Sequence, residues 1–590
     1  MLVYQAPLRD IRFVLLELLG IGDLTGLPAF AALTPETLGS VLDAAARFCE
    51  RELLPLARSG DEEGCRFEDG TVRTPRGFAE AYRLFRDQGW ASLARDPAVG
   101  GQGLPELVNL ALAEMVCSTN LAFGTYTGLA HAAYLLLAAH AAGDVRERYL
   151  EPLAAGRWGG TMCLTEPQCG TDLGLIRARA EPAEDGSYRV TGTKIFVTAG
   201  EHDLTDNILH LVLARIPGSP EGTRGLSLLL VPKLLAGRDG RLGERNRVRC
   251  GGLEEKMGLH ASATCTLSFE AATGYLLGGR EQGLRAMFTM MNTARLGVGV
   301  QGLGLAEIAY QSALAYARER RQGRAVGGAD AGPAPIILHP DVRRMLLRVR
   351  AFTEGARALV LWIGREVDLA RHHPDPERRQ AADDLVQLMT PVVKAFLTDE
   401  GFAAANLGLQ VFGGHGYIRA HGMERLVREA RVGQIYEGTN GVQALDLVGR
   451  KLRAGHGRML RRFFHPLSAF LDERADDAAM AEFAVPLGKA FRLLQDVTVR
   501  LATAADRDPV EGAAAASEYL RLVGLLALGY LWARAAETAL GAPGRAEDEA
   551  FYARKLATAR FFMARVLPET AGLGEAIRGG SAPLVASDAF

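Results

Sequence analysis

The sequence predicts an α+β protein in which a β domain lies between helical domains. Apolar residues recur at helical spacing before residue 158 and after residue 280. The segment between them is instead made of short runs rich in Val, Ile, Thr and Leu, divided by Gly, Pro and charged residues. A chain of 590 residues is also too long for one simple core, which favours about three or four domains. We therefore expect the order helices, strands, helices and more helices.

The first helical domain is expected over residues 37–158, after an N-terminal extension of residues 1–36. The run PETLGSVLDAAARFCERELLPLA places an apolar stripe on one face of a helix, formed by Leu38, Val41, Leu42, Ala45 and Phe48. The runs LVNLALAEMVC and AHAAYLLLAAH continue the same pattern.

The β domain is expected over residues 159–279. Its strand candidates are SYRVTGTKIFVTAG, NILHLVLARI, GLSLLLVPK and ASATCTLSFE. In the last of these, polar Thr264, Thr266 and Ser268 alternate with apolar residues, which is the period of two expected for a half-buried strand.

Helical periodicity returns at about residue 283 and continues to the last residues of the sequence. The run VRRMLLRVRAFTEGARALVLWIGREV carries one apolar stripe, formed by Leu346, Val349, Ala356, Leu359 and Ile363. A second stripe at helical spacing comprises Tyr552, Leu556, Ala559, Met563 and Val566. We predict one helical domain over 280–453 and an additional one over 454–590.

Composition and charge exclude some classes of partner. The chain is 48% hydrophobic and 23% charged, as in ordinary globular proteins, and its net charge is −2. This balance gives no electrostatic reason to expect a nucleic acid or an anionic membrane as partner. We interpret local basic clusters, such as RERRQGR at 318–324, as solvated faces.

Cysteine use and hydropathy indicate a protein of a reducing compartment. The seven cysteines form no C-x-x-C pair, so we expect neither a disulfide framework nor a metal site. The first twenty residues do not have the pattern of a signal peptide. The apolar run LVGLLALGYLWA at 522–533 is shorter than the roughly 20 residues that a membrane span needs, and it favours a core helix. We expect a cytoplasmic protein without a membrane span.

Three motifs are ambiguous when each is taken alone. CLTEPQCGTD at 163–172 offers backbone N–H and hydroxyl groups to a polar ring or a phosphate, but a plain turn explains it better. In TGTKIFVTAGEHD at 191–203, Phe196 belongs either to the core or, with Thr198, beside a flat aromatic cofactor. QVFGGHGY at 410–417 allows close approach of a ligand to its glycines, or is a turn between helices in which His415 is only a turn residue.

A fourth motif, IYEGTNG at 435–441, resolves the ambiguity by combination. In this order and at these distances, the four motifs resemble the acyl-CoA dehydrogenase family over residues of about 40–453. The resemblance implies an N-terminal helical domain, a central β-barrel-like domain and a C-terminal helical bundle. It also implies that the block after 454 is the extra helical domain of the long members. YQAPLRDIRFVL and FVTAGEHDLTDNI are most similar to a long bacterial branch of the family.

The resemblance implies that Glu437 is a catalytic base. In the family, the Glu of the YEGT motif removes the α-proton of an acyl-CoA thioester while the β-hydrogen leaves as hydride to N5 of FAD, which yields the trans-2-enoyl-CoA. Because a thioester α-C–H is a very weak acid, the base must lie within reach of it, and fixed donors must stabilise the enolate-like charge. Tyr436 precedes Glu437 as in the family and is expected at the substrate.

Contacts to FAD follow from the same resemblance. They are Thr165, Gly170, Thr171, Phe196, Thr198, Arg320, Gln322, Gln410, Gly414 and Thr439. Arg320 and Gln322 would reach the FAD of an adjacent subunit, and a guanidinium suits a pyrophosphate. Phe196 stands where Trp is usual, Ala199 where Asn is usual, and Gly323-Arg324 where Phe-Gly is usual. Arg324 could supply a compensating charge.

Contacts to CoA are expected from MMNTARLGVG at 290–299. Arg295 matches the family's Arg near the base and the thioester, and Asn292 stands where short members have an Asp that contacts CoA. The alternative is a capping Asn and a helix-surface Arg.

The resemblance implies an FAD-dependent acyl-CoA dehydrogenase, of the kind that acts in fatty-acid β-oxidation. We expect a fatty acyl-CoA or a 3-methylmercaptopropionyl-CoA-type substrate and an electron-transferring flavoprotein as acceptor. The alternatives are an acyl-CoA oxidase that uses oxygen directly and a non-catalytic acyl-CoA-binding homologue. The long form implies a homodimer.

Overall fold

The chain folds into two compact units. The sheet unit comprises Arg47–Leu104 and Met115–Gly297, and the helical unit comprises Met1–Ala46, Pro105–Glu114 and Val298–Phe590. The computed structural model describes residues 2–327, 332–542 and 548–586. Its many helices and its central sheet confirm the predicted α+β class.

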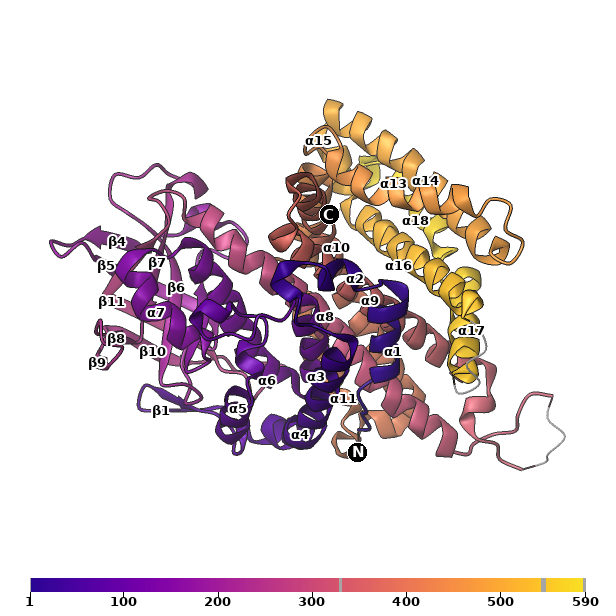
Figure 1. Ribbon diagram of the computed structural model, residues 1–590, viewed down its shortest axis with the longest axis horizontal. Coiled ribbons are helices and arrows are strands. Elements are labelled where there is room, and N and C mark those ends of the chain that lie inside the picture. Colours follow the sequence, from indigo (N-terminus) through magenta and orange to yellow (C-terminus); the bar gives the residue numbers. More distant parts are fainter. Residues whose placement is uncertain (1, 328–331, 543–547, 587–590) are drawn as a thin grey trace. The chain divides into compact units, whose positions relative to one another are not determined.

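The sheet unit contains a seven-stranded sheet (Figure 1), and five of its strands pair in a ring. The strands are β3 (Trp158–Cys163), β4 (Arg179–Pro182), β5 (Tyr188–Thr198), β6 (Asn207–Arg215), β7 (Leu226–Pro232), β10 (Val248–Leu253) and β11 (Thr264–Leu277). β11 pairs with β5, β5 with β4, β4 with β6, β6 with β7, and β7 again with β11. Because the pairing returns to β11, the sheet closes as a barrel, with β10 and β3 as extensions.

The strand sequences explain this closure. Thr264–Leu277 alternates buried and partly exposed residues at its start, as predicted, whereas all of Leu226–Pro232 is buried. Strands buried on both faces read as continuous apolar runs, and NILHLVLAR and LSLLLVP are such runs. Two hairpins flank the sheet, formed by β1 (Arg66–Glu68) with β2 (Thr71–Arg73) and by β8 (Leu234–Ala236) with β9 (Leu242–Arg245).

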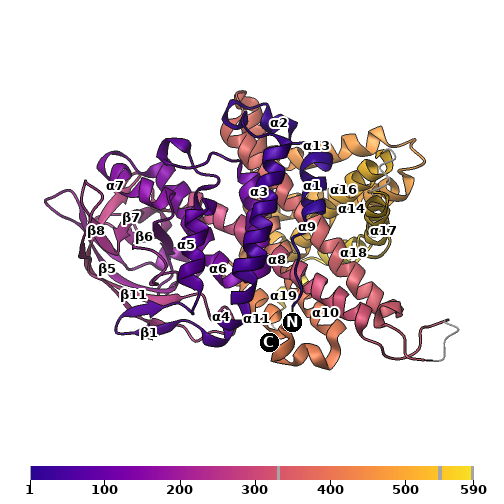
Figure 2. The same cartoon turned by 60° about the horizontal axis from the view of Figure 1, so that its bottom comes forward.

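Helices complete the sheet unit (Figure 2). They are α4 (Leu54–Glu63), α5 (Phe78–Asp87), α7 (Gly143–Ala154), most of α6 (Glu106–His140) and the start of α8 (Gly283–Glu319). α6 kinks at Asn120, whose backbone leaves the helical region and whose Oδ1 accepts a hydrogen bond of 3.1 Å from the N–H of Phe123. Asn120 therefore caps the second half of α6 from within the helix.

The helical unit is built around two long helices, α9 (Pro340–His372) and α10 (Pro376–Phe412), which pack against each other. Its other helices are α1 (Leu8–Arg12), α2 (Gly22–Thr25), nearly all of α3 (Pro35–Phe48), α11 (Met423–Gly433), α12 (Asn440–Asp446), α13 (Arg458–Glu473), α14 (Ala481–Arg507), α15 (Pro509–Ala514), α16 (Ala516–Gly541), α17 (Glu549–Arg565), α18 (Glu569–Arg578) and α19 (Ala582–Val585).

α16 is the buried centre of the last helical block, and it contacts α9, α10, α14, α17 and α18. The predicted core run 522–533 lies within it and is buried. Two glycines allow the close packing: a Cβ on Gly524 would lie 2.4 Å from the ring of Phe396, and one on Gly355 would lie 2.9 Å from Nε1 of Trp532. Among the described residues, only α6 is long and apolar enough to cross a membrane, and 83% of its most apolar window is buried inside the structure.

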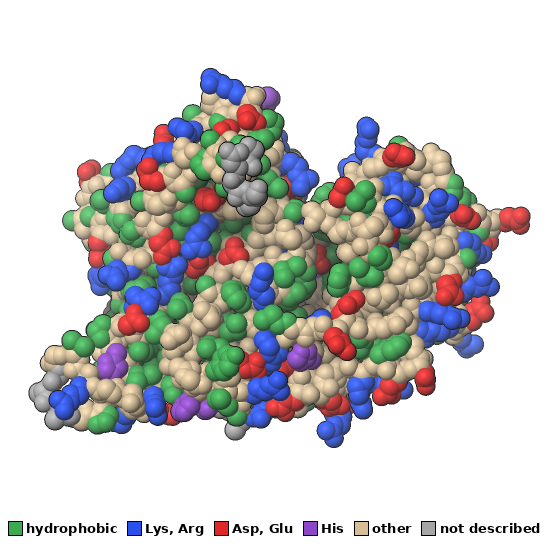
Figure 3. Space-filling model, turned by 180° about the vertical axis from the view of Figure 1, so that it is seen from behind, with side chains coloured by type: hydrophobic (Ala, Val, Ile, Leu, Met, Phe, Trp, Pro, Cys, Tyr) green, Lys and Arg blue, Asp and Glu red, His purple; other side chains and the backbone are tan. Residues whose placement is uncertain are grey.

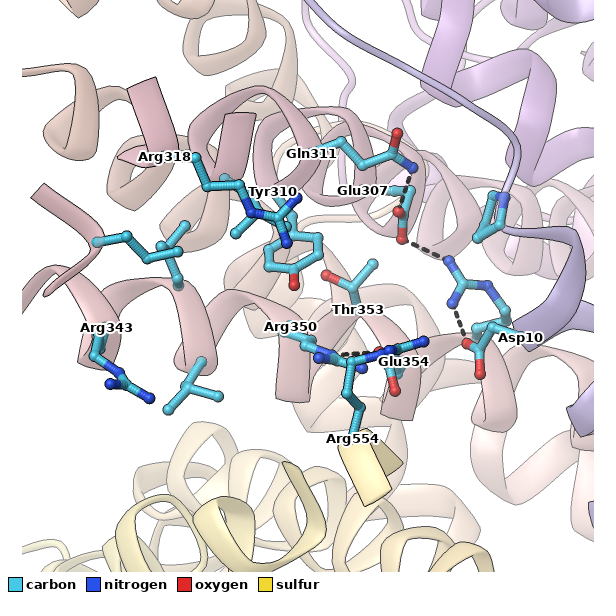
Figure 4. Close-up of a pocket in the computed structure, with 16 residues that line it drawn as sticks. Asp10, Glu307, Tyr310, Gln311, Arg318, Arg343, Arg350, Thr353, Glu354 and Arg554 are labelled. Atoms are coloured by element: carbon cyan, nitrogen blue, oxygen red, sulfur yellow. Dashed lines mark hydrogen bonds and ion pairs between the residues drawn. The ribbon is translucent and has the colours of Figure 1, made fainter. Parts of the chain in front are cut away.

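A buried cluster of charges joins distant parts of the helical unit. The Arg357 cluster comprises three cations and four acids: Arg350, Arg357, Lys555, Asp10, Glu114, Glu307 and Glu354. Arg357 is 1% exposed and pairs with Asp10, Glu114 and Glu307. Figure 4 labels Asp10 and Glu307 and marks their interactions with dashed lines. Lys555 is 3% exposed and bridges acids of α1 and α9. The cluster therefore fastens the N-terminal extension and α17 to the central helices.

The Arg357 cluster holds one more acid than cations, and the pKa of one of its acids, Glu114, is raised mainly by burial. Burial raises the pKa of Glu114 to about 7, with a further contribution from Glu307 and Asp10, although Arg357 opposes the shift. A proton bound to Glu114 near neutral pH makes the number of negative charges in the cluster equal to the number of positive charges.

The surface mixes both signs of charge. Lys and Arg side chains are interspersed with Asp and Glu on the face that Figure 3 shows. The basic run 318–324 is exposed throughout in the single chain. Its interpretation as a solvated face stays a prediction, because Arg320 and Gln322 of this run are also predicted to reach the FAD of an adjacent subunit.

Candidate active site

The predicted flavin-facing residues of the sheet unit gather at the end of β5. The pairing of β5 with β11 shifts by one residue between Lys194 and Val197, which marks a bulge. Within the bulge Phe196 has a φ of +56°, and its side chain is 60% exposed. This exposure excludes the interpretation of Phe196 as a core residue. Ala199 also has a φ of +56°, a conformation that Asn tolerates better than Ala.

The loop after β3 lies beside this bulge. The N–H of Ile195 donates to the carbonyl oxygen of Thr165 at 2.9 Å, and the hydroxyl of Thr161 donates to the carbonyl oxygen of Thr198. Thr165 and Thr198 are half-buried, whereas Gly170 and Thr171 are exposed. The structure thus brings an exposed aromatic ring next to two hydroxyl-bearing segments, an arrangement that fits a flat ring with polar edges.

A buried ion pair fixes the loop, and the sequence analysis did not identify it. Lys194 is 0% and Glu166 4% exposed, and their charged atoms lie 2.8 Å apart. Burial would raise the pKa of Glu166, but Lys194 and the N–H groups of Arg177 and Ala178 lower it overall. Lys194 occupies an inward position of β5, so a lysine at a core position of a strand was the available signal.

Asn292 and Arg295 lie on the part of α8 that belongs to the sheet unit. Nη1 of Arg295 donates to Oδ1 of Asn292 at 3.2 Å. Arg295 is 6% exposed, so the alternative of a helix-surface arginine is wrong.

The loop with the candidate base connects α11 to α12 in the helical unit. Glu437 is half-buried and has a φ of +57°, which is uncommon for a residue with a side chain and recurs at functional sites. Thr439 caps α12, since its hydroxyl accepts a hydrogen bond of 3.4 Å from the N–H of Val442. Buried Gln443 donates to the carbonyl oxygens of Glu437 and Gly438, at 3.4 Å each.

Asn440 ties this loop to α10. Its Oδ1 accepts from Nζ of Lys394 at 2.8 Å, and its Nδ2 donates to Asp399 at 2.8 Å. Lys394 is 0% exposed. Tyr436 donates through its hydroxyl to Oε1 of Gln301. The sequence analysis did not identify Lys394, although a single lysine in the apolar run TPVVKAFL was a signal for it.

The residues predicted to reach the FAD of an adjacent subunit lie on two neighbouring loops of the helical unit. Arg320 and Gln322 follow α8, whereas Gln410 and Gly414 lie at the end of α10, and all four are exposed. Tyr316 connects the two loops, because its ring stacks on Phe412 at 4.2 Å and its hydroxyl lies 2.9 Å from Nδ1 of His415. The nearby Tyr417 is 82% exposed.

The predicted site residues therefore form two sets. The sheet unit carries Thr165, Gly170, Thr171, Phe196, Thr198, Asn292 and Arg295, and the helical unit carries Arg320, Gln322, Gln410, Gly414, Tyr436, Glu437 and Thr439. Each set has its own buried lysine behind it, Lys194 in the first and Lys394 in the second. Among the described residues no group of His, Cys, Asp and Glu could hold a metal ion.

Family comparisons account for almost the whole chain. Models of the acyl-CoA dehydrogenase N-terminal, middle and C-terminal domains match residues 35–157, 161–272 and 281–452. A fourth model, described as acetyl-CoA dehydrogenase C-terminal like, matches residues 463–588.

Relatives match over their full length. The chain is 44% identical to the 3-methylmercaptopropionyl-CoA dehydrogenase of Ruegeria pomeroyi, over 96% of this chain and 97% of the relative. It is 34% identical to a broad-specificity linear acyl-CoA dehydrogenase of Mycobacterium tuberculosis, over 96% of both chains. The structure of an acyl-CoA dehydrogenase from Bacillus anthracis complexed with FAD has a similar fold, with a TM-score of 0.76, 20% identity, and coverage of 98% of this chain and 92% of that chain.

Proposed function

The chain belongs to the acyl-CoA dehydrogenase family of FAD-dependent oxidoreductases, and we propose that it converts an acyl-CoA thioester to the trans-2-enoyl-CoA with Glu437 as the base. The observation that carries this assignment is the left-handed backbone of Glu437, in a loop that Lys394, Asn440 and Gln443 hold to the buried helices. A solvated turn needs no such support, whereas a base must keep its position relative to the proton that it removes.

Glu437 acts on the α-carbon of the substrate. Its carboxylate takes the α-proton, and its backbone N–H donates to the thioester carbonyl, where negative charge develops. Tyr436 is fixed by Gln301 beside the base and limits the space for the acyl chain. Arg295 and Asn292 bind the CoA part of the substrate.

The residues of the sheet unit hold the cofactor. Phe196, Thr165, Gly170, Thr171 and Thr198 would hold the flavin, with the Phe196 ring against its flat face and the two hydroxyl groups of Thr165 and Thr198 available to its polar edge. When bound, FAD would supply the acceptor for the β-hydrogen, which leaves as hydride. Arg320, Gln322, Gln410 and Gly414 would bind the FAD of the second subunit of a homodimer, and the exposure of Tyr417 beside them is expected of a surface that a second subunit covers.

The relatives support a linear acyl-CoA as substrate. The two named relatives are a 3-methylmercaptopropionyl-CoA dehydrogenase and a broad-specificity linear acyl-CoA dehydrogenase. We therefore propose 3-methylmercaptopropionyl-CoA and short linear acyl-CoAs as substrates. The proposed acceptor is an electron-transferring flavoprotein, and the proposed compartment is the cytoplasm.

Anaerobic reduction of the flavin tests this proposal. FAD-loaded protein is mixed with 3-methylmercaptopropionyl-CoA or with acyl-CoAs of increasing length, and bleaching of the flavin absorption band is followed. We expect Glu437→Gln to retain FAD and to bleach about 10²–10⁴-fold more slowly, because the base is lost. Glu424→Gln, on the neighbouring α11, is the control and should bleach at the wild-type rate.

Two results would contradict the proposal. Unchanged bleaching by the Glu437→Gln protein would mean that another group removes the proton. A flavin that no acyl-CoA reduces would favour a non-catalytic acyl-CoA binder instead.

A further inference from the structure

A cavity of ≈ 580 Å³ lies among α9, α10, α13 and α16, on helices that pack against one another. Its lining includes six arginines and a histidine but a single acid, Glu366; the arginines are Arg365, Arg378, Arg458, Arg461, Arg462 and Arg534. None of these residues has a role in the proposed reaction. We propose that this arginine cavity binds a diphosphate-bearing ligand of nucleoside-diphosphate size.

The positive charge of the cavity is only partly neutralised. Glu366, which is 4% exposed, pairs with Arg365 and Arg378, and Asp384, which is 0% exposed, pairs with Arg458 and Arg462. Asp23 is the third acid, and it pairs with Arg365. Three acids therefore form ion pairs among the six arginines, and Asp383 acts on Arg458 without a direct ion pair, so positive charge remains in excess.

The excess charge belongs above all to Arg461 and Arg534. In the part of the chain that the structure describes, neither pairs with an acid. Arg461 donates to the carbonyl oxygen of His456 at 2.9 Å, and Arg534 donates to that of Leu18 at 2.9 Å. A guanidinium has five N–H donors, so each keeps donors for a ligand after these bonds are made.

Buried donors also lack acceptors here. Nε of Arg365 is buried and makes no hydrogen bond within the described residues, and the buried Nε of Arg462 makes none either, although it lies 3.5 Å from Oδ2 of its ion-pair partner Asp384. A buried donor without an acceptor is costly, and an anion in the cavity would satisfy such groups.

The size and the walls of the cavity select among anions. Arginines prefer carboxylate and phosphate because two parallel N–H donors match two oxygens. A single phosphate would leave most of a ≈ 580 Å³ cavity empty, whereas this volume is typical of sites for whole cofactors. Buried Trp362 and Tyr530 form an apolar wall with ring centroids 5.9 Å apart, against which a base can pack.

Calorimetric titration of the FAD-loaded protein tests the proposal. ADP and inorganic pyrophosphate are the two probes, each titrated at low and at high salt. We expect saturable binding that weakens as salt rises, because the attraction is between charges. Tighter binding of ADP would show that the apolar wall contacts the base, and equal binding would show that the diphosphate alone is recognised.

Variants that reverse or remove a positive charge test whether the probes bind in the arginine cavity. Arg461→Glu changes an exposed side chain, and we expect it to weaken binding of both probes at least about tenfold. Arg534→Gln should also weaken it. Arg507→Glu, an exposed position on α14 outside the cavity, is the matched control and should bind like the wild type.

Two outcomes would overturn the proposal. One is the absence of binding of either probe at millimolar concentration. The other is binding that neither Arg461→Glu nor Arg534→Gln changes, because the diphosphate would then lie elsewhere on the protein. Thermal unfolding of each variant establishes that it is folded.

Discussion

Two groups of arginines in the helical unit differ in how their charge is balanced. In the Arg357 cluster, four acids surround three cations, and Arg357 itself is 1% exposed. In the arginine cavity, three acids face six arginines, and Arg461 lies exposed at the surface. Burial forces neutralisation, because an unpaired charge inside a protein is very costly. Uncompensated charge persists only where water or a ligand can reach it.

Removing the central guanidinium of the buried cluster should have the largest effect on stability. Arg357→Met leaves Asp10, Glu114 and Glu307 buried without their shared cation. We expect the free energy of unfolding to fall by about 3–5 kcal/mol, as measured by urea denaturation. Arg344→Met is the control on the same helix, because Arg344 is exposed and its pair with Asp341 should contribute less than about 1 kcal/mol. Equal losses in the two variants would contradict the comparison.

The extra acid of the buried cluster should make stability depend on pH. The native pKa of Glu114 is about 7 and its ordinary value is 4.5, so the folded protein binds a proton that the unfolded chain releases. The contribution of Glu114 to stability is therefore complete below pH 4.5 and is lost as the pH rises toward 7.

Glu114→Gln measures this contribution directly. Other groups also make stability depend on pH in this range, among them His202 and His210: burial lowers their native pKa values from 6.5 to about 3, so the unfolded chain binds protons that the folded protein does not. Taking the difference between variant and wild type removes their effect. The free energy of unfolding of the variant, relative to the wild type, should rise by roughly 3 kcal/mol between pH 4.5 and pH 7. A flat difference would mean that Glu114 is ionised throughout.

The smallest effect on stability is expected in the arginine cavity. Arg461 has no acid partner among the described residues, so Arg461→Gln should change the free energy of unfolding by less than about 0.5 kcal/mol. Urea denaturation without added phosphate checks this. A loss similar to that of Arg357→Met would show that the cavity arginines serve structure rather than a ligand.

Much of the fold follows from local patterns in the sequence. The alternation in ASATCTLSFE predicted a strand and lies in β11, and the run 522–533 predicted a core helix and lies in α16. These elements were predictable because their periodicity depends only on which face is buried. The left-handed backbone of Phe196 and Glu437 was not predictable, because neither is a glycine and the surrounding structure imposes the conformation.

The Arg357 cluster and the arginine cavity could not be predicted from local patterns in the sequence. The partners of Arg357 come from α1, α6 and α8, and the cavity arginines come from α9, α10, α13 and α16. No window of sequence contains either group. Arg295 was expected either at CoA or on a helix surface, and its burial excludes the second alternative. Its role at CoA stays a prediction.

The packing of α16 makes the rest of the helical unit depend on the last helical block. Gly355 leaves room for Trp532, and Gly524 leaves room for Phe396. Each of the two helical blocks, 280–453 and 454–590, therefore accommodates a large side chain of the other. Deleting residues 454–590 would expose the apolar faces of α9 and α10 to water and open a gap where Trp532 was. Truncation alone would therefore not give a stable shorter protein, because the helices that the block covers would first need new, polar or space-filling side chains.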